Sequence, residues 1–239
     1  MTEPTPIHLK PQTELAERVL LPGDPQRALA VAQDVLESPR MFNHHRGLWG
    51  YTGLAKDGEL LTVQSTGMGG PSAAIVVQEL IMLGARSFIR IGTCGALDPR
   101  LEIGEIVTAE RALSDDGAGA ALGADGWVAP DPALTAALAE ATGGPSVGVV
   151  STDLFYDRRA DRTGLWRERG AAVVEMEAAA LFQLALLHEL AAACVLGVTD
   201  VLGEDDARTR IDQDALAELG VRLGRVGAAA LAGAGAATR

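Results

Sequence analysis

Arginine, threonine and glycine residues stand where two apolar segments end, in combinations that suit the binding of an oxyanion. Arg27 follows a Pro-Gly-Asp-Pro turn, in which Gly23 allows close approach of the backbone and the next helix offers free N–H groups. Arg90 stands within an apolar run, where a cation is costly to bury without an anion, and Thr93 follows between glycines. The alternatives are a plain surface turn around Arg27 and an internal ion pair between Arg90 and an acidic residue.

Two carboxylates, Glu175 and Glu177, flank Met176 at the end of another apolar run, just before an expected helix. Acidic side chains at a helix start are favoured by the macrodipole, which is the structural alternative. The functional interpretation is that one carboxylate accepts hydrogen bonds from vicinal hydroxyls, as on a ribose. Met176 would then be the apolar floor under the sugar.

A further carboxylate, Asp200, ends the last apolar run, with Arg208 and Arg210 downstream. A carboxyl group in this place could be a general acid whose protonation is tuned by its neighbours, and a loop or capping aspartate is the alternative. The glycine-rich junction Ser65–Ser72 lacks the glycine spacing of dinucleotide-binding and triphosphate-binding loops. It therefore gives little support to a nucleoside triphosphate site.

These junctions need a scaffold in which short strands alternate with longer helices. Apolar, Val- and Ile-rich runs bounded by Gly or Pro predict strands, and amphipathic runs with Pro near their starts predict helices. The alternation after Leu60 indicates an α/β fold with a mixed or largely parallel central sheet, whose ligands collect beyond the carboxyl ends of the strands. The Gly/Ala/Asp-rich stretch Asp115–Gly126 is expected to be a surface loop. The expected strands are Arg18–Leu21, Leu60–Gln64, Phe88–Ile91, Glu105–Ala109, Ser146–Val150, Ala172–Val174 and Ala193–Val198, and the expected helices are Pro25–Leu36, Pro71–Leu83, Pro132–Ala141, Met176–His188 and Asp212–Leu231.

Length, charge and cysteine content restrict the class of protein. We expect residues 1–239 to form one domain. The net charge of -12 disfavours nucleic acids and anionic membranes as partners, and no run approaches the roughly 18 apolar residues that cross a bilayer. Two cysteines without a CxxC pattern favour a reduced, cytoplasmic protein. The four histidines show no metal-ligand spacing, so we expect no metal.

Six motifs occur in order between His8 and about Arg210: LPGDPxRA, HRGLWGYTG, TGMGxPS, RIGTCGA, DLFY and VEMEAA. As an ordered set they resemble the nucleoside phosphorylase family that contains the hexameric bacterial purine nucleoside phosphorylases and the uridine phosphorylases. The resemblance implies a phosphorylase/hydrolase-like α/β fold, in which helices flank a mixed and partly barrel-like sheet. It also implies homodimers that exchange site residues, assembled as trimers of dimers, with phosphate as co-substrate and no organic cofactor.

The resemblance also implies a role for each matching residue. Phosphate would be held by Gly23, Arg27, Arg90 and Thr93, with Arg46 of the neighbouring subunit. Ribose would contact Met68, Glu175, Met176 and Glu177, with His8 of the neighbour at the 5′ hydroxyl. The base would lie among Cys94, Gly95, Phe155, Val174 and Asp200.

A purine substrate is favoured because Asp200 matches the acid that would protonate purine N7, and burial would help it hold that proton. The uridine branch would carry a Gln-x-Arg pair shortly after Phe155, where this chain has Tyr156–Asp161. Thr93, by contrast, is more typical of that branch, so uridine phosphorylase remains an alternative. A nucleosidase that uses water is a third possibility, although it would not need three phosphate-facing arginines. Arg208 or Arg210 would assist the acid.

Overall fold

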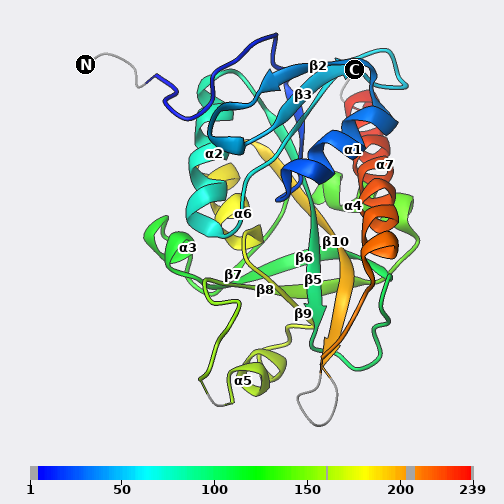
Figure 1. Cartoon of the computed structure of the whole chain (residues 1–239). Helices are drawn as coiled ribbons and strands as arrows, with labels where there is room; N and C mark the ends of the chain where they lie inside the picture. The colour runs from blue at the N-terminus through cyan, green and yellow to red at the C-terminus, as the bar shows by residue number, and fades with distance from the viewer. Residues whose placement is uncertain (1–4, 160, 203–207, 238–239) are drawn as a thin grey trace.

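The chain forms one mixed sheet whose middle closes on itself (Figure 1). The computed structural model describes residues 5–159, 161–202 and 208–237. The strands are β1 Arg18–Leu21, β2 Glu37–Asn43, β3 Gly50–Leu54, β4 Leu60–Gln64, β5 Ser87–Ala96, β6 Ile106–Asp115, β7 Trp127–Val128, β8 Ser146–Thr152, β9 Val173–Glu175, β10 Ala191–Leu202 and β11 Arg208–Arg210. The helices are α1 Pro25–Val35, α2 Gly70–Met82, α3 Gly117–Ala121, α4 Pro132–Thr142, α5 Arg162–Glu168, α6 Ala178–Leu187 and α7 Gln213–Ala237, with a 3-10 turn at His45–Gly47.

Five strands make a closed ring in the order β10, β6, β8, β9 and β5, because β5 also pairs with β10. From β5 the sheet continues as an open part through β1, β4, β3 and β2. Strand β5 belongs to both parts: Ser87–Arg90 pair with β1, and Gly95–Ala96 pair with β9 of the ring. The predicted α/β fold with a mixed, partly barrel-like sheet is confirmed.

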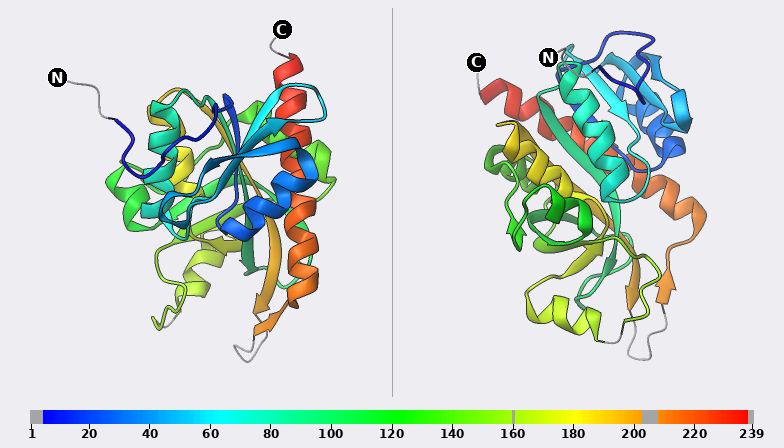
Figure 2. Two further views of the ribbon diagram at one scale, coloured as in Figure 1. Left: turned by 45° about the horizontal axis from the view of Figure 1, so that its top comes forward. Right: turned by 90° about the vertical axis from the view of Figure 1, so that its left-hand side faces the viewer.

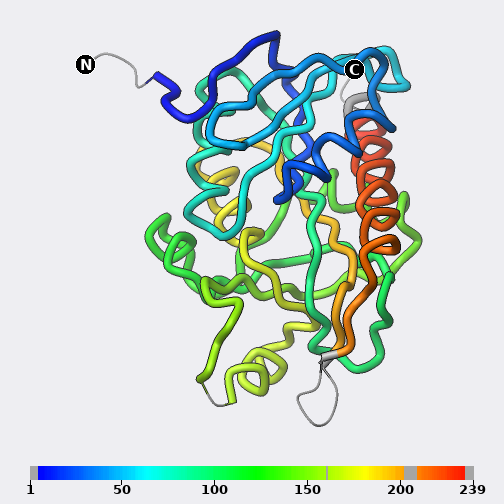
Figure 3. Tube along the Cα trace, viewed as in Figure 1, coloured from blue at the N-terminus to red at the C-terminus, as the bar shows by residue number. Residues whose placement is uncertain are grey.

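Helices cover the two faces of the sheet and bury separate apolar cores (Figure 2). On one side α1, α4 and α7 pack together over β1, β5 and β10, and their core is built from Ala, Val, Leu and Ile with one buried aromatic residue, Tyr51. On the other side α2 packs against α6. In the trace of Figure 3 the chain leaves β4, passes through α2 and enters β5, and both of these strands pair with β1 in parallel. Loops that follow different strands are thereby brought together.

The sequence predicts the regular elements well and misses the local ones. Strands Arg18–Leu21 and Leu60–Gln64 are found with the predicted bounds. The expectation that Asp115–Gly126 is only a loop is wrong, because it contains α3. Asp116 caps that helix by accepting a hydrogen bond of 2.7 Å from the Gly119 N–H, which supplies the order that a Gly/Ala composition hides. The β2–β3 hairpin, α5 and the short strands β7 and β11 were also not predicted.

Two glycines of α7 give a matched test of the packing between α7 and α1. A Cβ at Gly224 would lie 2.5 Å from Val31 Cγ1, whereas a Cβ at Gly233 would meet nothing within 4 Å. We expect Gly224→Ala to lower the free energy of unfolding by about 1–3 kcal/mol through overpacking. Gly233→Ala should raise it by about 0.5–1 kcal/mol, because alanine is the better helix former. Urea unfolding followed by circular dichroism measures both; a stabilising Gly224→Ala would contradict this packing.

Candidate functional site

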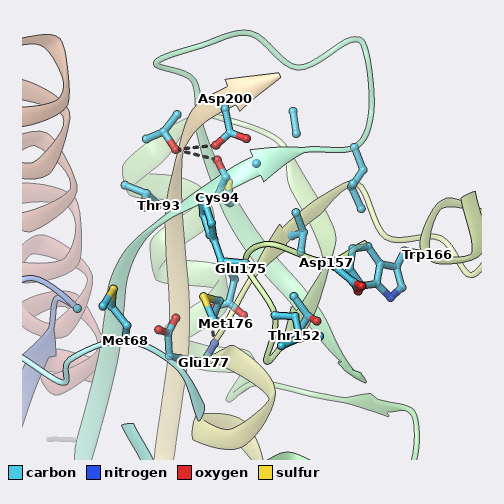
Figure 4. A pocket seen from close by; sticks show the side chains of 18 of the residues that line it. Met68, Thr93, Cys94, Thr152, Asp157, Trp166, Glu175, Met176, Glu177 and Asp200 are labelled. Atoms are coloured by element: carbon cyan, nitrogen blue, oxygen red, sulfur yellow. Dashed lines mark hydrogen bonds between the residues drawn. The ribbon is translucent and has the colours of Figure 1, made fainter. Parts of the chain in front are cut away.

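A cavity of about 920 Å³ opens where β1, β4, β5, β8, β9 and β10 reach their carboxyl ends (Figure 4). For β1, β4, β5 and β10, which run parallel, this is the edge at which ligands collect, because the strand ends and the following loops converge there. Strand β9 runs antiparallel to β5 and reaches the same cavity from the other direction. Most of the predicted site residues line it: Gly23, Arg27, Met68, Arg90, Thr93, Cys94, Gly95, Phe155, Val174, Glu175, Met176, Glu177, Asp200 and Arg210.

Three predicted residues are not placed in this cavity. His8 hydrogen bonds through Nδ1 to Glu79 Oε1 at 2.7 Å, and Arg46 is exposed in the 3-10 turn. The two segments adjoin, since His45 Nδ1 lies 3.0 Å from the carbonyl oxygen of His8. His8 and Arg46 were expected to serve a neighbouring subunit, and this role stays a prediction. The backbone of Arg208 begins β11, while its side chain lies outside the described residues.

Arg90 forms a buried ion-pair network with both predicted carboxylates. Its Nε donates to Glu175 Oε2 at 2.9 Å, and its Nη2 donates to Glu177 Oε2. The second oxygen of Glu177 accepts the Gly69 N–H at 2.5 Å. Within the described part of the chain, the buried Nη1 of Arg90 has no hydrogen-bond partner. The internal ion pair considered from the sequence is therefore present, and it leaves Nη1 of Arg90 unpaired within the described residues.

The charges of this network shift several pKa values. Burial alone would lower the pKa of Arg90, but Glu177 and Glu175 outweigh it and raise that pKa above its ordinary value. Burial raises the pKa of Glu177. The positive charge of Arg90 opposes this rise, and the negative charge of Glu175 adds to it, because one cation is paired with two carboxylates. Burial lowers the pKa of Arg27, and the positive charge of Arg90 lowers it further against the opposing effects of Asp24 and Glu177. A bound anion would relieve the repulsion between Arg27 and Arg90.

Glu175 holds the start of α6 in place. Besides Arg90, its carboxylate accepts the backbone N–H groups of Glu177 at 2.9 Å and Ala178 at 3.0 Å. The Ser151 hydroxyl donates to its other oxygen at 2.5 Å. This is the structural role for an acidic residue before a helix that the sequence had left open. The carboxylate thus fixes the backbone that carries Met176 and Glu177, and its place beside a ribose stays a prediction.

Asp200 lies at an irregular point of β10, where the pairing with β5 shifts register between Val198 and Asp200. Thr199 Oγ1 lies 3.2 Å from the carbonyl oxygen of Cys94 and 3.3 Å from Asp200 Oδ1, so its single proton is shared between these two acceptors. Arg210 faces Asp200 across the β10–β11 ladder, with Nη2 4.0 Å from Oδ1. A Cβ at position 95 would lie 3.0 Å from Asp200 Oδ2, so a side chain there would press on this carboxyl group.

Apolar and aromatic groups form the wall between Asp200 and the ion-pair network. The Phe155 ring is 44% exposed, and the Arg210 guanidinium lies 5.4 Å from its centre. Phe155 also packs edge-to-face on Tyr156, with ring centres 5.0 Å apart. Burial raises the pKa of the Cys94 thiol well above its ordinary value, so Cys94 contributes a neutral surface to the wall. A flat, largely apolar ring suits this space.

Sequence reasoning missed the part of the cavity that α5 forms. The helix is only seven residues long and contains Gly164, so no apolar period reveals it. Trp166, one of three tryptophans, was the available signal, since a rare aromatic residue in a charged segment marks a packed position. Other lining residues that were not predicted are Leu97, Thr152, Leu154, Asp157, Arg158, Arg159, Arg162, Thr163 and Thr199.

None of the helices in the described ranges has the length and hydropathy that crossing a membrane requires. Across the same residues, His, Cys, Asp and Glu side chains do not gather in groups that could hold a metal ion. The side chains that can contact a ligand in the cavity are therefore its arginines, its carboxylates and its apolar wall.

Comparison with known proteins agrees with this geometry. The family model described as the phosphorylase superfamily matches residues 17–232. A DeoD-type purine nucleoside phosphorylase of Caldanaerobacter subterraneus subsp. tengcongensis is 39% identical over 206 residues, which cover 81% of this chain and 87% of the relative. DeoD-type purine nucleoside phosphorylases of Roseobacter denitrificans and Streptococcus uberis are 36% and 33% identical, over 84% and 87% of this chain and 89% and 91% of theirs. This chain belongs to the phosphorylase superfamily.

Proposed function

We propose that this chain is a purine nucleoside phosphorylase, which converts purine ribonucleosides and 2′-deoxyribonucleosides reversibly into the free base and (deoxy)ribose 1-phosphate. One observation carries the proposal: a single cavity brings Arg27 and Arg90 together with Glu177 and Asp200. Arg90 lies on β5, and Asp200 lies farther along β10, the strand that pairs with β5 in parallel. The names of the similar proteins support the same reaction.

Phosphate would bind between the two guanidinium groups. Arg90 would donate from Nη1, which has no partner among the described residues, and Arg27 stands in the first turn of α1. The expectation that this helix offers free N–H groups is wrong, because the Asp24 carboxylate caps the helix and accepts the N–H groups of Gln26 and Arg27. Thr93 adds a hydroxyl from β5. A phosphate dianion in this place would lie below the anomeric carbon of the sugar. It would stabilise the positive charge that develops as the glycosidic bond breaks, and then attack that carbon.

The ribose would lie on Met176, with its hydroxyls on the Glu177 carboxylate. In the structure both oxygens of that carboxylate are engaged, by the Gly69 N–H and by Arg90. A diol would therefore replace or share these bonds when it enters. Asp200 would donate its proton to N7 of the leaving purine, and Arg210 would position that carboxyl group from β11.

Base release measured with and without phosphate tests the proposal. Inosine, adenosine and guanosine should release their bases only when phosphate is present, and ribose 1-phosphate should form in equal amount. Equal rates without phosphate would show a nucleosidase, and activity confined to uridine would show a uridine phosphorylase. Either result would contradict the proposal.

We further propose that the working unit is a homodimer with shared sites, built into a hexamer. The support is the position of His8 and Arg46, which adjoin each other but do not line the cavity of their own chain. No organic cofactor or metal would be needed, the protein would act in the cytoplasm, and residues 1–239 would form a single domain. Both cysteines are buried and free, as a reducing compartment allows.

Complementation between inactive chains tests the shared site. Arg46→Ala and Asp200→Ala should each abolish most activity alone. If the subunits are mixed under conditions that allow exchange, a hybrid dimer contains one site with both residues intact. We expect about one quarter of the parent activity to return at random mixing, because half of the dimers are hybrids with one good site each. Phosphorolysis of inosine before and after mixing measures this, and no recovery despite proven exchange would contradict a shared site.

A further inference from the structure

We propose that the cavity has a second binding region, which takes a planar, uncharged substituent on the six-membered ring of the purine. This region, here named the α5 arm, is walled by Leu97, Asp157, Thr163 and Trp166. The inference rests on the proposed function, since that function places the purine next to the arm.

The α5 arm lies beyond the predicted base site along β5. Thr93 and Gly95 are on β5, and Leu97 follows its last residue. At a rise of about 3.3 Å per residue, Leu97 lies about 7 Å past Gly95, which is enough for one more ring. Figure 4 shows Trp166 and Asp157 at the end of the pocket opposite Met68. The cavity is thus longer than the row of sites for phosphate, sugar and base.

A purine would direct its substituents into this arm. The ribose is attached at N9 of the five-membered ring, and C2 and C6 lie on the far edge of the six-membered ring. With the ribose on Met176 and Glu177, that far edge faces away from them and toward the α5 arm. A group on C6 or C2 would therefore enter the arm without moving the sugar or the base.

The inner surface of the arm is apolar. Leu97 and Trp166 are 2% and 5% exposed and belong to one apolar cluster, against which Val174 of the predicted base wall packs. The indole N–H of Trp166 donates to Asp115 Oδ2 at 2.9 Å, so its polar atom is already satisfied. The wall of the base site therefore continues into the arm as an apolar surface, which suits a flat aromatic group.

Two arginines at the rim are already paired with carboxylates, and the other charged residues that line the cavity there, Arg158 and Asp161, are opposite in sign. Arg159 is paired with Asp157, with Nη2 and Oδ2 2.5 Å apart, and Arg162 is paired with Asp115. Hydrogen bonds from Arg159 lower the pKa of Asp157 to about 2, so this pair stays ionised and balanced. An anionic substituent would have to compete with these carboxylates for the two guanidinium groups.

Contacts to the barrel hold the arm open. Arg167 Nε donates to the carbonyl oxygen of Leu97 at 2.7 Å, which ties α5 to the end of β5. The Trp166 and Arg162 contacts with Asp115 tie α5 to the last residue of β6. Thr163 stands between these anchored residues with a short side chain. Its small size leaves the arm free, and it is the position at which the arm can be filled.

Two substrates that differ by one ring test the proposal: the ribonucleosides of 6-methylthiopurine and 6-benzylthiopurine. The parent protein should cleave the benzyl compound with a kcat/KM at least equal to that of the methyl compound. Thr163→Phe should lower kcat/KM for the benzyl compound by at least about tenfold and leave the methyl compound unchanged. Thr163→Val, which keeps the size of the side chain, is the matched control and should change neither. Thermal melting of both variants checks that they fold.

Calorimetry measures the binding of both nucleosides without phosphate, and therefore independently of turnover. We expect the same contrast: Thr163→Phe should weaken binding of the benzyl compound and leave binding of the methyl compound unchanged. A parent that takes only the methyl compound, or a Thr163→Phe variant that loses both equally, would overturn the proposal. A ribonucleoside with a dicarboxylate on N6 that is preferred over the benzyl compound would also overturn it. If the protein shows the binding contrast but no phosphorolysis, the proposed function fails while the α5 arm stands. If it shows phosphorolysis without the contrast, the α5 arm fails while the proposed function stands.

Discussion

Asp200→Ala should lower kcat for inosine by about 10²–10⁴-fold, which is the usual contribution of a general acid. The carboxyl group is buried and held by Thr199, and a guanidinium group faces it from β11. Without a proton at N7, the purine must leave with its electrons on the imidazole ring. KM should change far less than kcat, because the lost interaction develops only as the bond breaks.

A substrate that needs no acid is the control for this prediction. In 7-methylinosine, N7 is already alkylated and the base is positively charged, so it leaves without taking up a proton. Asp200→Ala should therefore cleave 7-methylinosine at close to the parent rate, measured by base release with phosphate present. An equal loss on inosine and 7-methylinosine would show that Asp200 shapes the site and does not donate a proton.

Arg90→Met should be the most damaging single change to stability, with a loss of about 3–5 kcal/mol in the free energy of unfolding. The variant leaves Glu175 and Glu177 buried without their shared cation. The size of this loss follows from the cost of burying a charge without a partner, and urea unfolding at neutral pH measures it. Phosphorolysis should be lost as well, because the free N–H group for the anion goes with the side chain.

The pH dependence of this loss has a definite sign. The pKa of Glu177 is already raised in the parent, and without Arg90 it rises further. The folded variant then binds protons that the unfolded chain does not, so its stability increases as the pH falls from neutral toward the ordinary pKa of a glutamate side chain. The difference in free energy of unfolding between the parent and Arg90→Met should therefore become smaller as the pH falls. The triple change Arg90→Met, Glu175→Gln and Glu177→Gln should be more stable than Arg90→Met alone at neutral pH; a deficit that is independent of pH would contradict this account.

The fold could be predicted because its main elements have strong local signals. Apolar runs ended by Gly or Pro give the strands, and Pro at the first turn gives the starts of α1 and α4. Closure of the ring did not follow from local pattern, since it depends on β10 pairing with β5 about 100 residues away. That feature was inferred from the resemblance to a known family, and it is found in the structure.

The site could be predicted as a set of residues, but not as a network of contacts. Glu177 was expected to hold a sugar, and the structure adds that Arg90 and the Gly69 N–H occupy its oxygens first. These partners lie about 87 and 108 residues away along the chain, so no spacing in the sequence reveals them. The seven-residue α5 is similar: it is held in place by Asp115, the last residue of β6, and by Leu97, which follows β5, and both are distant along the chain.

Strand β5 carries Arg90, Thr93, Cys94 and Gly95 on one continuous stretch of extended backbone. The separation between the group that holds the anion and the groups that touch the leaving base is therefore set by bond lengths and angles, not by how two domains or two helices settle against each other. Thermal expansion of the helical layers would move both ends together and leave that separation unchanged. Evolution toward a differently sized sugar or base would have to act through the segments that approach this strand from the side, while the strand itself keeps its length.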